Sequence, residues 1–577
     1  MIKRYSLKNH ILDLWKILNI SEKKNYVLLL LMMIISVFIE ALSLGSIYPL
    51  LLLFFDKEKF IKLIENLNIF EFEFLNDLTI ELSTISIFIC FLFLIKNLIV
   101  LIINIFSQNI EKKIIVRLKS TLLQTYLYKE YSELIDKNTA TLVRNVMSAV
   151  DKTKYGLRNI LTLINEIGLF IFLLILIAII NLKLFLMLSL IVIIPIVILG
   201  PISKKIIMKN GAAAFHYVAV TLKNLMQAIS MIKEIKIFGK IRYFLDYFSS
   251  SENRYQSHQR KLYIIKTLPK QLFEIIAVVS FFFALNLYIS ISNNNVQDFL
   301  PSLGIIILSA IRIFPSLNKV IISLQKYQQI QKPIDEIKKD LKNKNINNFS
   351  KDSLKPSNGN LEKFSEIKLE DVSFKYKNTE NYIFQEFNLT INKFDKIGVT
   401  GHSGSGKSTL IEILMGLLKT NKGKILFNNH EMQEINTEWY KLFAYVPQKV
   451  VLIDDTLISN ITLEYSEDNI DYQKLNESIK FSGLKKFVNK NNGNLNIILG
   501  ENGSKMSGGE KQRVAIARAV YKNPQILVFD ESLNGLDVDM KKEILDGLQD
   551  YLQNKTAIFI SHNSNDLKLC DKIIKID

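Results

Sequence analysis

The sequence predicts two domains of different fold class: an all-α domain of six transmembrane helices, and after it an α/β P-loop nucleotide-binding domain. Three observations lead to this prediction. The long apolar runs all lie between residues 26 and 321, residues 360–577 have the composition of a soluble protein, and a glycine-rich loop follows a short apolar run in that second part. A chain of 577 residues is also too long for one hydrophobic core.

Six stretches of the sequence are long and apolar enough to cross a membrane. A bilayer core of about 30 Å needs about 20 helical residues with few charges. The six stretches are approximately 26–55, 79–107, 160–181, 184–203, 271–292 and 299–321. Soluble helical bundles rarely contain six stretches of this kind, so a membrane domain is favoured.

The basic residues indicate which side of the membrane the loops face. The net charge is +17, with ten Lys or Arg between residues 108 and 158 and twelve between 204 and 268, both next to apolar spans. Such residues mark the cytoplasmic side. We therefore expect membrane lipids, and no nucleic acid, as partners. A general Lys, Asn and Ile richness of the source genome is the alternative explanation of the charge.

Composition also sets the expected domain boundaries. We expect a transmembrane domain over 1–341, a flexible linker rich in Lys, Asn and Ser over 342–361, and the nucleotide-binding domain over 362–577. Apolar residues at helical spacing within 56–70 predict an amphipathic helix outside the membrane, with an ordinary surface loop as the alternative.

The strongest motif lies at residues 401–408, which read G-H-S-G-S-G-K-S. This complete G-x-x-x-x-G-K-S sequence follows a predicted strand and precedes a predicted helix, and such a loop turns its backbone N–H groups towards phosphate. Lys407 would reach the outer phosphates of a nucleotide, and Ser408 would bind Mg²⁺. The candidate residues of this loop are Gly401, Ser403, Gly404, Ser405, Gly406, Lys407, Ser408 and Thr409.

A second motif delivers two carboxylates. Residues 526–529 are apolar, as expected of a buried parallel strand, and Asp530 and Glu531 follow directly. Asp530 suits the magnesium ion, held through water. Glu531 suits the general base that orients the attacking water.

Residues 506–513 read M-S-G-G-E-K-Q-R and resemble the signature of ABC transporters, usually L-S-G-G-Q. Ser507, Gly508 and Gly509 are intact, whereas Met506 and Glu510 differ, as does Asn534-Gly535 in place of Ser-Ala. The resemblance implies ATP and Mg²⁺ as cofactors and coupled ATP hydrolysis. It further implies that Tyr376 stacks on adenine, Gln448 senses magnesium, His562 contacts the γ-phosphate and Asp537 ends the D-loop.

The same resemblance implies a homodimer. The chain holds one glycine loop and one signature, and the family places one subunit's signature against the other's glycine loop. Short helices near 131–138 and 231–243 are similar to those with which the membrane domain of such exporters contacts the cassettes; solvated helix ends are the alternative. Because the chain stops fifteen residues after His562, we expect a short C-terminal edge.

Four ionisable residues within the spans are candidate substrate residues: Glu40, Lys96, Arg312 and Lys319. Charges there are costly and are usually placed for a purpose. Arg312 and Lys319 are two helical turns apart and so share one face, which suits an anionic pyrophosphate. The alternatives are that Glu40 and Lys96 pair with each other, and that Lys319 extends to water.

A closer resemblance covers both domains. Phe38-Ile39-Glu40 with Pro49, the external segment 56–70 and the tract from Arg312 to Lys319 look like the bacterial flippase for lipid-linked oligosaccharides of protein N-glycosylation. This resemblance implies a multi-pass protein of the bacterial inner membrane with a cytoplasmic ATPase domain, and a polyprenyl-pyrophosphate glycan as cargo. The alternatives are an exporter of a peptide, lipid or small molecule, and a membrane module that binds nucleotide without pumping.

Overall fold

The structure is a computed structural model, and it describes residues 12, 14–46, 78–180, 182–291, 300–341, 364–377, 379–432, 437–533 and 536–576. The chain divides into two compact units: Met1–Lys129 with Asp136–Ile346, and Glu130–Ile135 with Asn347–Asp577. The predicted external helix at 56–70, the linker 342–361 and Asn534-Gly535 lie outside the described residues.

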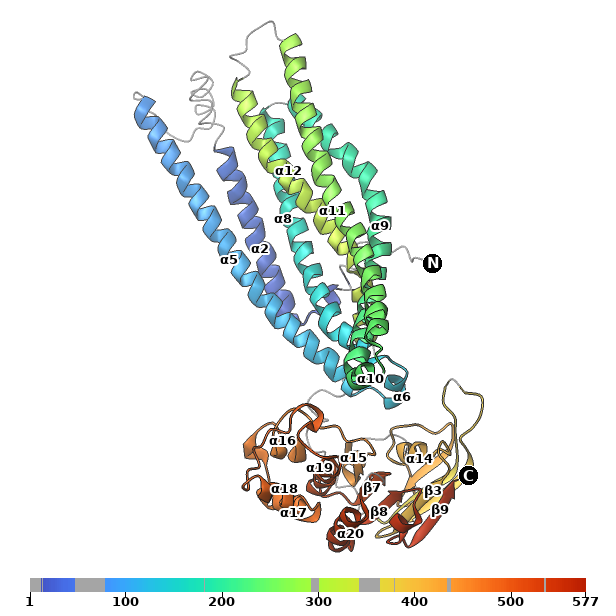
Figure 1. The fold of residues 1–577 in the computed structure, drawn as a ribbon. Helices are drawn as coiled ribbons and strands as arrows, with labels where there is room; N and C mark the ends of the chain where they lie inside the picture. Colours follow the sequence, from blue (N-terminus) through green and yellow to red (C-terminus); the bar gives the residue numbers. More distant parts are fainter. Residues whose placement is uncertain are drawn as a thin grey trace. The chain divides into compact units, whose positions relative to one another are not determined.

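The first unit consists of helices, and its long helices run side by side (Figure 1). The long helices are α2, α5, α8, α9, α11 and α12, and shorter ones lie between and after them. All the described helices of this unit follow with their bounds. They are α2 (Ile20–Gly45), α5 (Leu78–Leu127), α7 (Thr139–Arg144), a π-helical turn (Asn145–Ala149), α8 (Val150–Ile180), α9 (Leu182–Ser230), α10 (Ile232–Ile237), α11 (Ile241–Ile291), α12 (Leu300–Gln329) and α13 (Gln331–Leu341). Each of the six predicted spans falls on α2, α5, α8, α9, α11 or α12, apart from the end of the first span and residues 181, 292 and 299 at the ends of three others, which are not described. Among the described residues, three segments are long and apolar enough to cross a membrane: Ile20–Ser43, Ser86–Leu127 and Thr139–Ile175.

Ion pairs join the helices of this unit beyond the apolar spans. Arg117 on α5 donates two hydrogen bonds to Glu22 on α2, at 2.6 and 2.7 Å. Asp340 on α13 accepts hydrogen bonds from the Tyr126 hydroxyl at 2.6 Å, the Asn145 amide at 3.1 Å and the Lys137 ammonium at 3.1 Å. The last helix of the unit is thereby tied to the loop that begins after α5.

The second unit contains α6 (Tyr131–Ile135) and the soluble domain. The strands and helices of that domain are β1 (Glu366–Phe374), β2 (Phe384–Asn392), β3 (Lys396–Gly401), α14 (Lys407–Leu414), β4 (Lys422–Phe427), β5 (His430–Glu431), α15 (Thr437–Leu442), β6 (Phe443–Val446), α16 (Leu457–Thr462), α17 (Tyr472–Phe481), α18 (Lys485–Lys490), α19 (Gly508–Tyr521), β7 (Ile526–Asp530), α20 (Val538–Leu552), β8 (Thr556–Ile560) and β9 (Lys572–Ile576).

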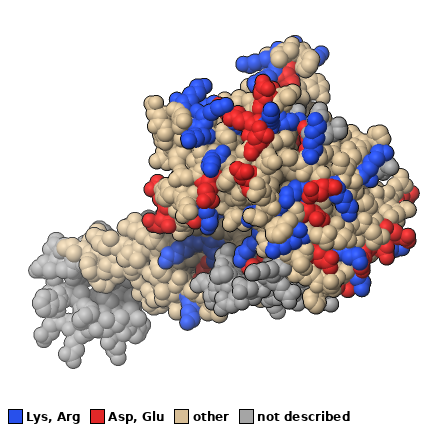
Figure 2. Space-filling view, turned by 90° about the horizontal axis from the view of Figure 1, so that it is seen from below, with Lys and Arg blue, Asp and Glu red and all other residues tan. Residues whose placement is uncertain are grey.

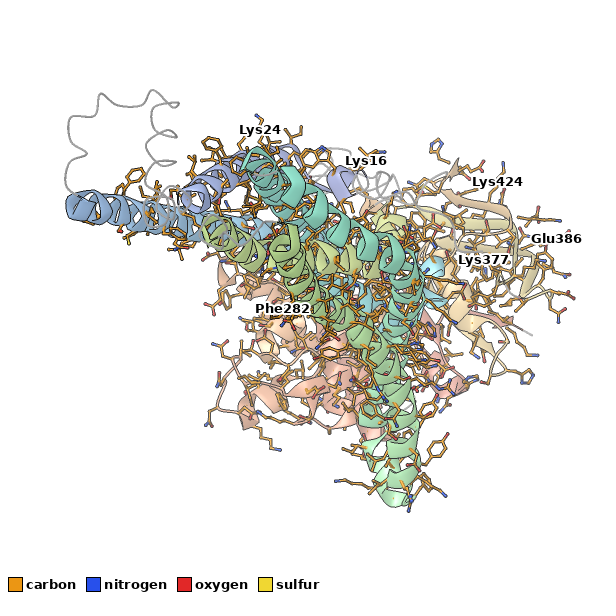
Figure 3. All side chains as sticks on the ribbon, turned by 90° about the horizontal axis from the view of Figure 1, so that it is seen from above. Lys16, Lys24, Phe282, Lys377, Glu386 and Lys424 are labelled. Carbon is orange, nitrogen blue, oxygen red and sulfur yellow. The ribbon has the colours of Figure 1, made fainter. Side chains whose placement is uncertain are left out.

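Two sheets organise the soluble domain. Its described strands form an antiparallel sheet in the order β2-β1-β4-β5 and a parallel sheet in the order β6-β7-β8-β3-β9. The outer surface near the antiparallel sheet carries charged side chains such as Lys377, Glu386 and Lys424 (Figure 3). Every residue of β7 and β8 is buried, as expected of central parallel strands.

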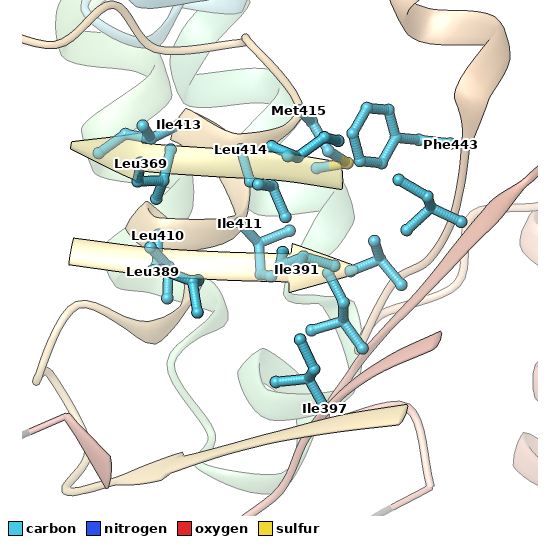
Figure 4. Packing of buried hydrophobic residues seen from close by; sticks show 14 of the residues in the cluster. Leu369, Leu389, Ile391, Ile397, Leu410, Ile411, Ile413, Leu414, Met415 and Phe443 are labelled. Atoms are coloured by element: carbon cyan, nitrogen blue, oxygen red, sulfur yellow. The ribbon is translucent and has the colours of Figure 1, made fainter. Parts of the chain in front are cut away.

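The core surrounds the helix that follows the glycine loop. Leu410, Ile411 and Leu414 of α14 pack against Leu369 of β1 and Ile391 of β2 (Figure 4). On the other face of the parallel sheet, α19 and α20 pack against β7 and β8. The carboxyl ends of β3 and β7 therefore meet at one edge, which is where ligands bind in open α/β sheets.

Candidate active site

The glycine loop joins β3 to α14 in a conformation that requires glycine. Gly404 and Gly406 have φ angles of 85° and 97°, in the left-handed region. A Cβ at Gly406 would also overlap the side chain of Ile383. Gly401 is the last residue of β3. A Cβ at this position would overlap the carbonyl oxygen of Ile576 on β9. The backbone of β9 and the side chain of Ile383 thus leave no room for a Cβ at Gly401 and Gly406.

Two polar groups of this loop fit a phosphate ligand. The Lys407 ammonium donates to the carbonyl oxygens of Gly401 at 3.1 Å and His402 at 2.8 Å, and so stays within the loop. The Ser405 hydroxyl is buried, and no described residue partners it. A buried hydroxyl without a partner is costly. Phosphate oxygens would supply the missing acceptor, so the residues present fit ATP.

Two further predicted residues lie beside this loop. The hydroxyls of Tyr376 and Thr409 are 3.2 Å apart. The ring of Tyr376 packs edge-to-face on Phe374, which fixes its orientation while leaving it half-exposed. The predicted nucleotide residues of this region thus lie on β3, on the loop after it, on α14 and on the segment after β1: Gly401, Ser403, Gly404, Ser405, Gly406, Lys407, Ser408, Thr409 and Tyr376.

The carboxylates of Asp530 and Glu531 occupy different surroundings. Asp530 is 8% exposed, and burial raises its pKa, although a hydrogen bond from the Tyr445 hydroxyl opposes the rise and the charge of Glu531 adds to it. Tyr445 was not predicted from the sequence. Its signal, a tyrosine on β6, three residues before Gln448, can be interpreted only once β6 and β7 are known to be neighbours.

Glu531 lies between two of the predicted residues. Its carboxylate accepts a hydrogen bond from Gln448 Nε2 at 2.7 Å and lies 2.8 Å from His562 Nε2. Its backbone has a φ of 47°, unusual for a residue other than glycine. Such strain is typical of a side chain held in place for a chemical step. The structure therefore brings Glu531, Gln448 and His562 into one cluster beside Asp530.

The signature residues begin α19. Ser507 is the N-cap of this helix: its hydroxyl accepts from the Glu510 amide at 3.2 Å, and Glu510 accepts from the Ser507 amide at 2.7 Å. This is a complete capping box. Met506 is buried among apolar side chains, where methionine replaces leucine with little change in volume. Gly508 has no neighbour within 4 Å of an added Cβ, so this side of the helix start is open.

Asp537 precedes α20 and has no side-chain capping bond. Gly509 could not carry a Cβ without overlapping Met540 of that helix. The signature and the segment that contains Asp537 are therefore closely packed in the described structure.

The comparisons with known proteins agree with this geometry. Residues 384–534 match the ABC transporter family. These residues form an ABC-type ATPase domain. A Rickettsia typhi protein named as an export ATP-binding/permease protein is 37% identical over 213 residues, which span 37% of each chain. A Rickettsia bellii protein of the same name is 26% identical over 521 residues, or 87% of this chain and 86% of that one.

The whole chain also matches a solved structure. A bacterial Atm1-family ABC exporter with ATP bound aligns with a TM-score of 0.75 at 18% identity, covering 97% of this chain and 94% of that one. The predicted fold class, a helical exporter-type membrane domain with an α/β P-loop ATPase domain, is confirmed.

The structure places three of the four candidate substrate residues. Lys96 and Glu40 form an ion pair of 3.1 Å, and Lys319 pairs with Glu166 at 2.7 Å. Glu40 and Lys96 therefore pair with each other, which was the alternative considered for them. The charge of Lys319 is balanced by the carboxylate of Glu166, a residue that was not predicted from the sequence. Arg312 lies on α12, but its side chain is not among those described.

Proposed function

We propose that two copies of this chain form an ATP-driven ABC exporter in the bacterial inner membrane, with the ATPase domains in the cytoplasm. The observation that supports this most is that Lys407 begins α14 and the capped Ser507 precedes α19, two motifs that the family resemblance would bring together on one ATP from different subunits. The exporter fold of the whole chain supports it further.

Within this proposal the chain's own residues have separate tasks. The glycine loop and Lys407 hold the phosphates, Tyr376 stacks on adenine, and Ser408, Gln448 and Asp530 would hold Mg²⁺, which supplies charge neutralisation when bound. Glu531 orients the attacking water, and His562 and Gln448 fix its carboxylate. The mixed acidic and basic surface seen in Figure 2 does not favour a nucleic-acid partner.

A dimer is directly testable. The detergent-solubilised protein should sediment as a dimer, and dilution to monomer should abolish hydrolysis. A stable monomer that hydrolyses ATP at the full rate would disprove this part of the proposal.

For the cargo we propose a lipid-linked oligosaccharide, that is, a polyprenyl-pyrophosphate glycan. The resemblance of the tract from Arg312 to Lys319 supports it, although Lys319 is paired with Glu166. Protein in liposomes should translocate a fluorescent lipid of this class in an ATP-dependent manner, and the lipid should stimulate its ATPase. Arg312→Gln should remove the stimulation and spare basal hydrolysis. Absence of both translocation and stimulation would leave export of a peptide, another lipid or a small molecule.

A further inference from the structure

Two basic side chains from different helices lie against one aromatic ring in the membrane unit. Phe215 of α9 is 1% exposed. The guanidinium carbon of Arg144 lies 4.0 Å from the centroid of its ring, and the Lys152 ammonium lies 4.7 Å from the same centroid. Arg144 also donates to the Phe215 carbonyl oxygen at 3.4 Å. Two cations are thus held against a single ring.

Two further lysines extend this group. Lys266 on α11 is near enough to Lys152 for its positive charge to act on it, and Lys326 on α12 acts on Lys266 in the same way. We call Arg144, Lys152, Lys266 and Lys326 the Phe215 cation cluster. Its members come from α7, α8, α11 and α12.

The neighbouring cations in this region have acidic partners, whereas no carboxylate of the described residues pairs with Lys152 or Lys266. Lys154 lies 3.4 Å from Glu111, and Lys119 lies 2.9 Å from Asp151. Among the described residues, the charges that act on Lys152 and Lys266 are all positive. The Lys266 ammonium bonds to the neutral Gln329 amide.

Arg144 is the exception within the cluster. The charges of Glu336 and Asp340 act on it and balance it in part. The uncompensated charge of the cluster is therefore carried by Lys152 and Lys266.

Arg144 is buried and Lys152 and Lys266 are half-buried, whereas Lys326 is exposed. Like charges that are partly withdrawn from water and lack counter-ions are unfavourable, and an anion between them removes the repulsion. Arg and Lys together suit phosphate, and basic pockets between helices at the cytoplasmic side bind lipid headgroups. The cluster lies on the helices that extend from the basic loops. We propose that the Phe215 cation cluster binds a phosphate-bearing anion, either a lipid phosphate headgroup or a free phosphate or pyrophosphate. Only the identity of the lipid rests on the proposed function.

The test compares two double variants that lose the same charge. Lys152→Gln/Lys266→Gln removes two cations of the cluster, and Lys119→Gln/Lys270→Gln removes two lysines that are paired elsewhere. Binding of farnesyl pyrophosphate to the full-length detergent-purified protein, measured by calorimetry, should weaken at least about tenfold in the first variant and less than twofold in the second. Lys152→Arg should keep the affinity for farnesyl pyrophosphate. This variant shows that a loss of binding in the first double variant comes from the lost charge and not from misfolding.

Equal affinity in both double variants, or no binding to the natural chain, would overturn the proposal. Competition between inorganic pyrophosphate and farnesyl pyrophosphate tells the two kinds of ligand apart. If inorganic pyrophosphate displaces farnesyl pyrophosphate at a similar concentration, the site binds a free anion. If it does not, the site binds a lipid headgroup. The two proposals can fail separately. Transport of a polyprenyl-pyrophosphate glycan with cluster-independent binding refutes the cluster site alone, whereas cluster-dependent binding without transport refutes the cargo alone.

Discussion

The Tyr445 hydroxyl donates a hydrogen bond of 2.8 Å to Oδ2 of Asp530. The two residues lie on adjacent parallel strands, β6 and β7. Burial and the charge of Asp530 raise the pKa of Tyr445, so the phenol is protonated and can donate. The bond fixes the orientation of this carboxylate at the end of β7. We therefore expect Tyr445 to act as a positioning residue for the proposed magnesium site.

Tyr445→Phe removes only this hydroxyl. A hydrogen bond to a charged group contributes about 1.5–3 kcal/mol, so the Mg²⁺ concentration at half-maximal ATPase activity should rise about tenfold. ATP binding in EDTA should be unchanged. Tyr465→Phe, at a fully exposed position, is the control. An unaltered magnesium titration would show that the bond has no role.

Glu531→Gln keeps the size of the side chain and removes its charge. Because the carboxylate is the proposed base, hydrolysis should fall about 10²-fold or more while ATP binding persists. Phosphate release and binding of labelled ATP measure the two effects separately. Persistent hydrolysis in this variant would place the base elsewhere, and normal transport in it would indicate that nucleotide binding alone drives the helices.

Glu510→Gln tests the unusual carboxylate of the signature. Glutamine can still accept the bond from the Ser507 amide, so stability should change little, whereas Glu510→Ala should lose about 1 kcal/mol of helix capping. Removing the negative charge should lower the ATP concentration needed for half-maximal hydrolysis, because the signature faces the partner's γ-phosphate in the proposed dimer. If the Glu510→Gln variant and the parent protein need the same ATP concentration for half-maximal hydrolysis, the charge of Glu510 has no effect on how the two ATPase domains close on ATP.

Ser405→Ala removes a buried hydroxyl that lacks a described partner. Without nucleotide, the melting temperature should be equal or higher, since an unsatisfied buried group costs about 1–3 kcal/mol. The rise in melting temperature on adding ATP should shrink. Ser403→Ala, at an exposed position of the same loop, should leave the nucleotide-free melting temperature unchanged. A drop in nucleotide-free stability for Ser405→Ala would mean that the hydroxyl already has a partner.

Glu40→Gln leaves the ammonium of Lys96 without its ion-pair partner in an apolar span. Breaking a buried pair in this way should cost about 3 kcal/mol. The second change in Glu40→Gln/Lys96→Met should recover most of that loss. Thermal unfolding in detergent measures both, and a double variant no more stable than the single one would contradict the pairing.

The sequence predicted the fold class because its signals are local. Six apolar runs and a glycine loop between a strand and a helix each lie within about 30 residues of chain. The positions of Glu531 and Lys407 were readable for the same reason, since parallel strands deliver their last residues to one edge.

Relationships between distant segments were not readable. Tyr445 and Asp530 are 85 residues apart, and Lys319 and Glu166 are 153 apart. Neither pair has a spacing rule, because helix and strand periodicity extend over only a few turns. Lys319 therefore looked like an unpaired cation in the sequence. The cluster around Phe215 was invisible for the same reason, as its members come from four separate helices.

The contacts of Asp340 have a mechanical consequence. Lys129 and Lys137, on either side of Glu130–Ile135, lie 3.9 and 3.1 Å from one carboxylate oxygen of Asp340. The loop closed by these residues cannot stretch or twist against α13 without separating charges. Asp340 therefore holds both flanks of the segment 130–135 at one point of α13.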